Sequence, residues 1–362
     1  MLVIFTVLHF LVDGICGAAL AVYALNQPFF EPIVYYFGMY NAVAFGTQWL
    51  TGYLFDRKEN WLRGSFIFAT LTLGAGTVPA LGIAAQTLLL GIGNSVFHVA
   101  AGSIVLRRFP TYKELGIFVS GGAVGLALGL NSFVGPYPFL LACTALSLFV
   151  FWQLNKKDTQ YGNNNCKKSA DSISITGADP ERQTCFAGNA GTESAAGFST
   201  VSGSLTGAAA ISMFFLLGCI VLRSMGSGQG DSSYIMLFPC VFAAGKALGG
   251  IVCDRIGYKQ TIITVFLLSF IALQLQGLAA SVLLVLAFNM TMPLTLRLVH
   301  WCNPRYPGMM FGLAAGCLLP GVYYQGFSIP PQAMVVLQFL CLAAAGRLLL
   351  KEKADTGLSG SD

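Results

Sequence analysis

Ionisable side chains are scarce inside the long apolar stretches of this sequence, and those present are its candidates for chemistry. His9 and Asp13 lie four residues apart in one apolar stretch near the start of the chain. This spacing places both on one face of a helix. A carboxylate beside an imidazole can take up and release a proton near neutral pH. The spacing indicates either a proton-coupling pair or a pair that only stabilises helix packing.

Two basic side chains, Arg223 and Lys246, also fall inside apolar stretches. If both face a central cavity, they form a positive site for an anionic solute, because a guanidinium suits a two-pronged contact with carboxylate or phosphate. A structural role is the alternative for each. Arg223 can extend to the outer lipid headgroups, and Lys246 can pair with Asp13 or with a helix-end carbonyl.

Four further polar side chains are predicted to bind substrate at the depth of the membrane: His98, Asn41, Gln48 and Asn289. The histidine can instead relay protons or be a packing residue, and the amides can simply hydrogen-bond neighbouring helices. The sequence contains no phosphate-binding loop, serine-hydrolase motif or zinc-protease motif. We therefore expect no enzyme activity, no cofactor and no metal site.

The composition indicates which elements position these residues. Of the 362 residues, 55% are hydrophobic and 10% are charged, whereas soluble domains carry about 25% charged residues. Repeated apolar runs near the length that crosses a bilayer predict an all-α membrane protein with twelve transmembrane helices. The predicted helices cover 2–24, 32–53, 64–82, 84–106, 115–133, 136–154, 207–226, 233–252, 260–278, 280–298, 308–325 and 331–350.

The charges of the loops predict the orientation. Apart from Arg223 and Lys246, all of the 20 basic residues lie in alternate loops, at the adjoining helix ends or in the tail. Basic loops stay on the cytoplasmic side, which predicts a multi-pass cell-membrane protein with both termini in the cytoplasm. The net charge of +5 gives no reason to expect a nucleic-acid partner, because the basic residues are confined to these places.

Composition also divides the chain. Residues 155–206 are rich in Gly, Ser, Thr and Asn and are predicted to form a flexible cytoplasmic linker. The linker separates a six-helix bundle, 1–154, from a second one, 207–350, and residues 351–362 form a disordered tail. Because each bundle has an even number of helices, the two have the same orientation and form a parallel pseudo-repeat around a central cavity.

A loop motif occurs once in each bundle, 198 residues apart, after the second and the eighth predicted helix. It resembles the Gly-x-x-x-Asp-Arg-x-Gly-(Arg/Lys) motif of the major facilitator superfamily. That resemblance implies a transporter whose motif loops act as gates. The first copy departs from the pattern after its arginine, which predicts that the second copy is the stronger gate. The motif residues are Gly52, Asp56 and Arg57 in the first copy, and Gly250, Asp254, Arg255, Gly257 and Lys259 in the second.

A narrower likeness lies in helices 1, 4 and 5. The segments His9-Phe10-Leu11-Val12-Asp13, Gly91 to His98 and Gly121 to Gly129 resemble the fosmidomycin-resistance type of efflux protein, which implies export by antiport. Val99 stands where that group usually has proline after the histidine, and Leu130 stands where antiporters of the superfamily usually place proline after the last glycine. Glycines also recur every four residues in helix 5, and again in helix 11 at Gly308, Gly312 and Gly316. Such rows let helices approach closely and slide.

Together these features predict a secondary active transporter that moves a small polar or anionic solute by alternating access. With the twelve predicted helices numbered in chain order, the solute would bind between helices 1, 4, 7 and 10. Helices 2, 5, 8 and 11 would lie at the moving interface. The expected partners are the solute, a proton and the lipid bilayer, and the expected state is a monomer. The alternative is a receptor or scaffold that keeps the fold and docks its partner through residues 155–206.

Overall fold

The computed structural model describes residues 1–25, 30–176, 206–226, 234–323 and 329–355. Within these residues the chain is helical and contains no strand. The first half consists of α1 (Leu2–Leu25), α2 (Phe30–Gly46), α3 (Gln48–Arg57), α4 (Trp61–Gly76), α5 (Ile83–Arg108), α6 (Tyr112–Leu130) and α7 (Pro136–Thr176). The second half consists of α8 (Gly207–Gly226), α9 (Leu237–Ile256), α10 (Tyr258–Gln274), α11 (Gly277–Cys302), α12 (Pro307–Gly316), α13 (Leu319–Tyr323) and α14 (Pro331–Asp355).

The twelve predicted helices are confirmed, although two of them are interrupted. Helix 2 is divided into α2 and α3 at Thr47, and helix 11 into α12 and α13. The Thr47 hydroxyl donates to the Val43 carbonyl over 2.7 Å and therefore competes with the backbone N–H for it. Within the described residues, eight helices are long and apolar enough to cross a membrane.

Three predicted boundaries differ from the structure. The predicted helix over 64–82 ends early, at Gly76, and a short 3-10 helix (Pro79–Leu81) leads to Gly82, whose φ of 75° favours glycine. Helix α7 continues to Thr176, so the first part of the predicted linker is helical, while 177–205 lie outside the described residues. Helix α14 likewise enters the predicted tail and ends at Asp355.

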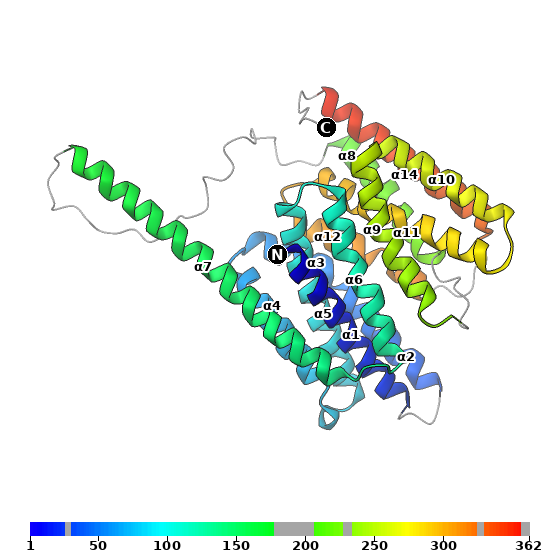
Figure 1. The fold of residues 1–362 in the computed structure, drawn as a ribbon, viewed down its shortest axis with the longest axis horizontal. Helices are drawn as coiled ribbons and strands as arrows, with labels where there is room; N and C mark the ends of the chain where they lie inside the picture. Colours follow the sequence, from blue (N-terminus) through cyan, green and yellow to red (C-terminus); the bar gives the residue numbers. More distant parts are fainter. Residues whose placement is uncertain (26–29, 177–205, 227–233, 324–328, 356–362) are drawn as a thin grey trace.

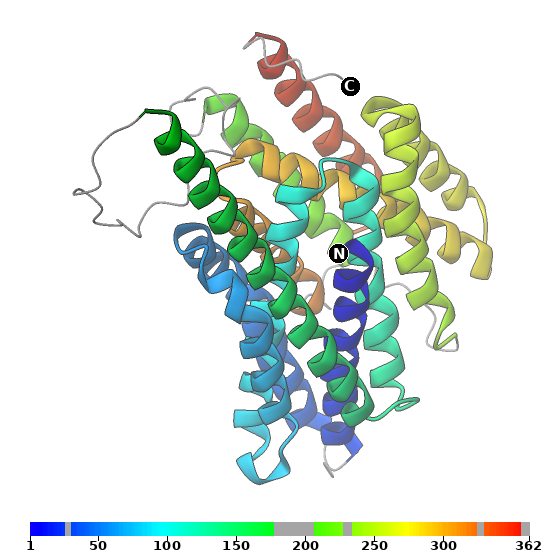
Figure 2. The same ribbon diagram turned by 60° about the vertical axis from the view of Figure 1, so that its left-hand side comes forward.

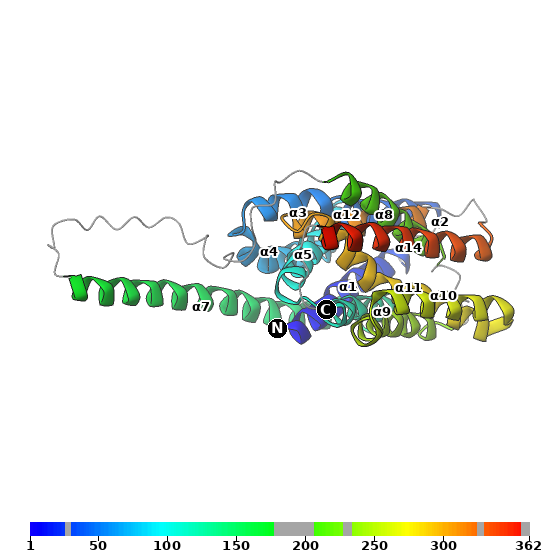
Figure 3. The same ribbon diagram turned by 90° about the horizontal axis from the view of Figure 1, so that it is seen from above.

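The two halves form neighbouring groups of helices, with α7 extending beyond its group (Figures 1 and 3). Figure 2 shows the same two groups turned, with the first half in blue to green and the second in green to red. Between the halves, α3 packs on α12 and α6 packs on α9. Counted as predicted helices, α3 belongs to helix 2, α12 to helix 11, α6 is helix 5 and α9 is helix 8. These four helices were expected at the moving interface.

Glycines permit both of these contacts. A Cβ on Gly52 would overlap the backbone of Gly308, and a Cβ on Gly250 would overlap the backbone of Tyr112. The glycine row of predicted helix 5, which is α6, has a different neighbour. A Cβ on Gly125 would overlap the carbonyl of Phe10 on α1. That row therefore tightens packing within the first half, and other glycines form the interface between halves.

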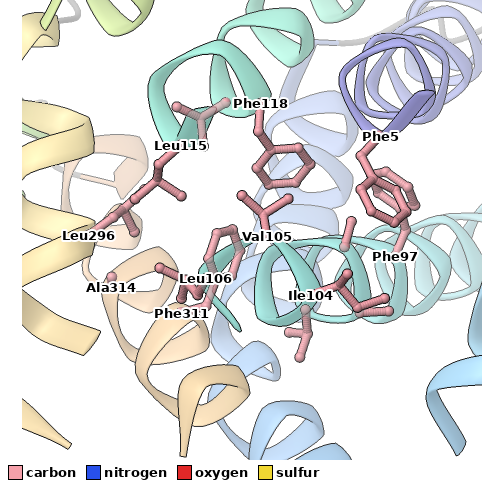
Figure 4. Packing of buried hydrophobic residues seen from close by; sticks show 14 of the residues in the cluster. Phe5, Phe97, Ile104, Val105, Leu106, Leu115, Phe118, Leu296, Phe311 and Ala314 are labelled. Atoms are coloured by element: carbon pink, nitrogen blue, oxygen red, sulfur yellow. The ribbon is translucent and has the colours of Figure 1, made fainter. Parts of the chain in front are cut away.

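One continuous apolar core joins α1, α5 and α6 to α11 and α12. The rings of Phe118 on α6 and Phe311 on α12 have centroids 6.3 Å apart, and those of Phe5 and Phe66 stack at 5.7 Å. Figure 4 shows this layer, with Leu296 of α11 beside the same region. The core lies between the halves and fixes how the polar residues of α1, α5 and α6 are placed against one another.

Candidate functional site

A cluster of four polar side chains joins α1 to α5. The Nε2 atoms of His9 and His98 lie 2.8 Å apart. Asp13 places its carboxylate 3.3 Å from Nε2 of His9 and 3.6 Å from Nε2 of His98, and Asn94 donates to it over 2.9 Å. The predicted pair of His9 and Asp13 thus faces His98, which the sequence placed among the substrate-binding residues.

Backbone carbonyls orient both imidazoles of this cluster. Nδ1 of His9 lies 2.9 Å from the carbonyl oxygen of Phe118, and Nδ1 of His98 lies 2.9 Å from that of Asn94. Both rings are buried, as is Asn94, whose Oδ1 has no hydrogen-bond partner. The amide of Asn94 was not predicted as a site residue. It stands one turn before His98 on α5, within the segment from Gly91 to His98 whose resemblance was noted above.

Helix α6 lies directly against the cluster. A Cβ on Gly122 would overlap both the carboxylate of Asp13 and the ring of His9, so only glycine fits here. One turn earlier, the same helix supplies the Phe118 carbonyl that holds His9. Nearer the start of the helix, Gly116 lies against the backbone carbonyl of Lys246 on α9. Helix α6 therefore connects the cluster to the second half.

Two basic residues of the second half stand near this cluster. The side chain of Lys246 interacts electrostatically with Asp13 and His98, and also with Arg223 on α8. Arg223 is 3% exposed and donates to the Thr295 hydroxyl over 3.0 Å. Arg223 is therefore buried among helices. It does not extend outward, as it would if it reached the outer lipid headgroups. The cluster on the first half thus interacts electrostatically with Lys246 on the second, and Lys246 in turn with Arg223.

The three predicted amide residues do not join the cluster. Asn41, Gln48 and Asn289 each donate to the carbonyl four residues earlier in their own helix, over 2.8, 2.7 and 2.9 Å. The backbone of Gln48 is also in close contact with Gly312 of α12, and Asn289 packs against Gly245 of α9. In this conformation they take part in helix structure and packing.

The cluster also offers ligand atoms for a cation. His9, Asp13 and His98 each present one nitrogen or oxygen atom, and these atoms all lie within 4.8 Å of one another. Such residue types bind transition-metal ions as well as protons. A proton and a divalent metal ion are therefore the two cations that the cluster could accept, whereas the sequence predicted no metal site.

The two loop motifs make matched contacts across the interface between halves. Asp56 accepts hydrogen bonds from the backbone N–H groups of Gly308 and Met309, over 3.0 and 2.8 Å. Asp254 accepts them from Tyr112 and Lys113, over 3.0 and 2.7 Å. Each carboxylate thus caps the first turn of a helix in the opposite half, where the helix dipole favours negative charge.

In this structure the first copy makes the larger number of side-chain contacts, and the prediction that the second copy is the stronger gate stays a prediction. Asp56 additionally accepts a hydrogen bond from Arg107 over 2.9 Å, and the Arg57 guanidinium lies over the rings of Tyr53 and Tyr306. Arg57 and its counterpart Arg255 are both exposed, and so is Lys259 of the second copy. Gly257 adopts a φ of 84° and turns the chain from α9 into α10, a conformation that favours glycine.

A further contact between the halves involves Arg297, which lies near the end of α11. This side chain is 2% exposed. It donates to the carbonyl oxygens of Leu106, Phe109 and Thr111 over 3.3, 2.5 and 2.9 Å. An arginine of α11 thus holds the end of α5 and the following loop. The sequence offered no clear signal, because an arginine near a helix end is also typical of an interfacial anchor.

Comparison with known proteins gives matches in structure alone. No protein-family model and no curated protein sequence matches the chain. The solved structures similar to it include FucP, a major facilitator superfamily transporter, in the outward conformation, at 13% identity and a TM-score of 0.54. A variant of the E. coli fucose:proton symporter FucP matches at 12% identity and a TM-score of 0.56.

Each of these two matches covers 96% of this chain and 97% of the other. Both helical bundles and the interface between them are thus included. At such low identity the likeness concerns the fold, and it agrees with the apolar helices and with the paired contacts of Asp56 and Asp254. The chain therefore has the fold of the major facilitator superfamily transporters, two parallel six-helix bundles of a multi-pass membrane protein.

Proposed function

We propose that the protein is a secondary active transporter that couples the movement of a small polar or anionic solute to protons. The observation that carries this proposal is the close cluster of His9, Asp13 and His98 on the first half, where Asp13 and His98 also interact electrostatically with Lys246 on the second. Ionisable groups at membrane depth are costly and mark ion and substrate pathways. Here they lie where two halves of a transporter fold meet, so a change in their charge acts on the arrangement of the halves.

The matched caps support alternating access. When Asp56 and Asp254 cap helices of the opposite half, that end of the molecule is held closed. Opening it must break both sets of hydrogen bonds together, because each set joins the two halves. We place this end in the cytoplasm and the protein in the cell membrane, since its loops carry most of the basic residues.

Lys246 and Arg223 are the proposed contacts for the anionic group of the solute. A guanidinium and an ammonium in a buried site bind a carboxylate or phosphate through charge-assisted hydrogen bonds. Arg223 already uses one nitrogen on Thr295, which fixes its position. We expect Arg223→Gln to raise the KM for an anionic solute with a smaller effect on exchange at saturating solute, because the variant weakens binding and leaves the proton cluster intact.

Transport by purified protein in liposomes tests the proposal. A thermal-shift screen of small carboxylates, phosphates and sugars selects the solute, and uptake is then measured with and without an imposed pH gradient. Faster uptake with an inward proton gradient identifies symport, and faster uptake with an outward gradient identifies antiport. Asp13→Asn should lose the response to either gradient yet retain solute exchange. If wild-type uptake ignores the gradient, proton coupling is rejected.

A further inference from the structure

The hydrogen-bond geometry of the two buried histidines requires more protons than two neutral rings provide. Nδ1 of His9 faces the Phe118 carbonyl oxygen and Nδ1 of His98 faces that of Asn94, each at 2.9 Å. A carbonyl only accepts, so each Nδ1 must carry a hydrogen. In two neutral imidazoles this uses both ring hydrogens. The Nε2 atoms then face each other at 2.8 Å with two lone pairs and no hydrogen.

One additional cation removes this conflict. We propose that the coupling proton lies between Nε2 of His9 and Nε2 of His98, as an imidazole–imidazolium hydrogen bond, while Asp13 stays ionised beside it. This inference rests on the proposed function, because it states where the coupled proton is held. It makes His98 an equal partner of His9, and it gives Asp13 the role of counterion in place of proton carrier.

The position of Asp13 agrees with this assignment. Its oxygens lie 3.3 Å and 3.6 Å from the two Nε2 atoms, both further than the 2.8 Å between the nitrogens. One of its oxygens also accepts a hydrogen bond from Asn94, a contact that favours the ionised carboxylate. A proton on Asp13 would leave the shortest contact of the cluster, between two nitrogens, without a hydrogen.

The groups around the histidine pair determine how charge is balanced once the proton leaves. Asp13 and Cys16 belong to α1, Tyr40 of α2 hydrogen-bonds Cys16, and Lys246 of α9 interacts electrostatically with Asp13 and His98. Helix α6 contributes the Phe118 carbonyl and Gly122, neither of which carries charge. With the proton bound, the imidazolium balances Asp13. Without it, Lys246 is the neighbouring positive group, so proton release transfers the role of counterion to the opposite half.

This exchange explains how proton binding acts on the interface between the halves. The loaded cluster is neutral as a unit within the first half, and its attraction to Lys246 is weak. The unloaded cluster carries the charge of Asp13 and attracts Lys246. Helix α6 lies between them and contacts the backbone of Lys246 through Gly116 and the cluster through Gly122. Proton binding to the cluster thus changes its attraction to Lys246 across the interface between the halves.

Infrared difference spectroscopy between acidic and alkaline buffer locates the proton. Only a protonated carboxylic acid gives the high-frequency C=O stretch. We expect the wild type and Asp13→Asn to have the same signal in this region, and the wild type to have imidazolium bands that His98→Asn lacks. A carboxylic acid band that is present in the wild type and missing in Asp13→Asn would overturn the assignment.

Transport separates this inference from the proposed function. His98→Asn should reduce gradient-driven uptake to the rate without a gradient while retaining solute exchange, and His9→Asn should do the same. The matched control is His300→Asn, which alters the third histidine of the chain, outside the cluster. A wild type that ignores the gradient rejects the proposed function. A wild type that responds, together with a His98→Asn variant that responds equally, rejects only the shared proton.

A metal ion is the competing occupant, and it has its own test. If Zn²⁺ sits between the two nitrogens, chelation of the purified protein should abolish transport and added Zn²⁺ should restore it. We expect chelation to leave uptake unchanged, and added Zn²⁺ to inhibit it by displacing the proton. Loss of uptake on chelation that Zn²⁺ reverses would overturn the shared proton.

Discussion

Gly122 of α6 lies so close to Asp13 of α1 that no side chain fits between them. A Cβ at this position would overlap the carboxylate of Asp13 and the Nε2 atom of His9. The close approach also brings the Phe118 carbonyl, on the same helix, within 2.9 Å of His9. The position of one glycine thus sets both the space around the proton cluster and the acceptor that orients its first histidine.

Gly122→Ala is therefore expected to damage coupling more than stability. Forcing an extra methyl group into a packed site costs about 1–3 kcal/mol of folding stability, whereas the atoms that it would displace belong to Asp13 and His9, so gradient-driven uptake should fall strongly. The control is Gly218→Ala on α8, where a Cβ would meet no atom within 4 Å. Uptake into liposomes should be normal for Gly218→Ala. Equal uptake by both variants would show that the contact has no role.

The paired caps predict similar effects from Asp56→Asn and Asp254→Asn. Asparagine still caps a helix, so each change removes mainly the charge, which contributes up to about 1 kcal/mol at a helix N-terminus. Hydrogen exchange should become several-fold faster in the first turn of α12 for Asp56→Asn, and in that of α6 for Asp254→Asn. Because Asp56 also accepts a hydrogen bond from Arg107, the increase in exchange for Asp56→Asn should be at least as large as that for Asp254→Asn. Faster exchange in the Asp254 variant alone would support the asymmetric gate predicted from sequence.

Much of the fold could be predicted from the sequence because the bilayer imposes simple rules. Apolar runs of fixed length predicted twelve helices, and the even number of helices in each bundle predicted two parallel halves. The interruption at Thr47 could not be predicted, since a threonine hydroxyl also bonds its own helix in uninterrupted helices. The continuation of α7 to Thr176 was missed because polar, glycine-containing sequence is also typical of linkers.

The candidate site was predicted only in part. The pairing of His9 with Asp13 depends on spacing within one helix, which a sequence reveals directly. The contact of His98 with both depends on how α1 packs against α5, across 89 residues of sequence, and no local pattern contains that information. The contacts of Arg297 could not be predicted for the same reason, because its three carbonyl partners belong to the other half.

Arg297→Lys tests that contact between halves. A lysine has one ammonium group and cannot reproduce the forked geometry by which Arg297 reaches three carbonyls. Loss of two hydrogen bonds from a charged donor should lower the free energy of unfolding by about 3–6 kcal/mol, measured by thermal unfolding in detergent. The control is Arg305→Lys, where the arginine is exposed. Equal unfolding temperatures for the two variants would contradict the role assigned to Arg297.

The electrostatic relation between Asp13 and Lys246 makes a prediction that only a double variant can test. Lys246→Gln removes the positive group of the second half that interacts with the cluster. When the proton is absent, the negative charge of Asp13 then lacks this positive partner in the second half. In alkaline buffer this variant should therefore unfold at a lower temperature than the wild type. Adding Asp13→Asn removes the uncompensated charge and should recover part of the loss, with a coupling energy of about 0.5–3 kcal/mol.

In acidic buffer the proton on the histidine pair balances Asp13, so the coupling between the two substitutions should shrink. Lys259→Gln is the matched control, because it removes an exposed lysine just beyond the end of α9. It should unfold like the wild type at both pH values. Additive effects of Asp13→Asn and Lys246→Gln in alkaline buffer would show that the two charges do not interact. The exchange of counterions between the halves would then be excluded as the link between proton release and movement.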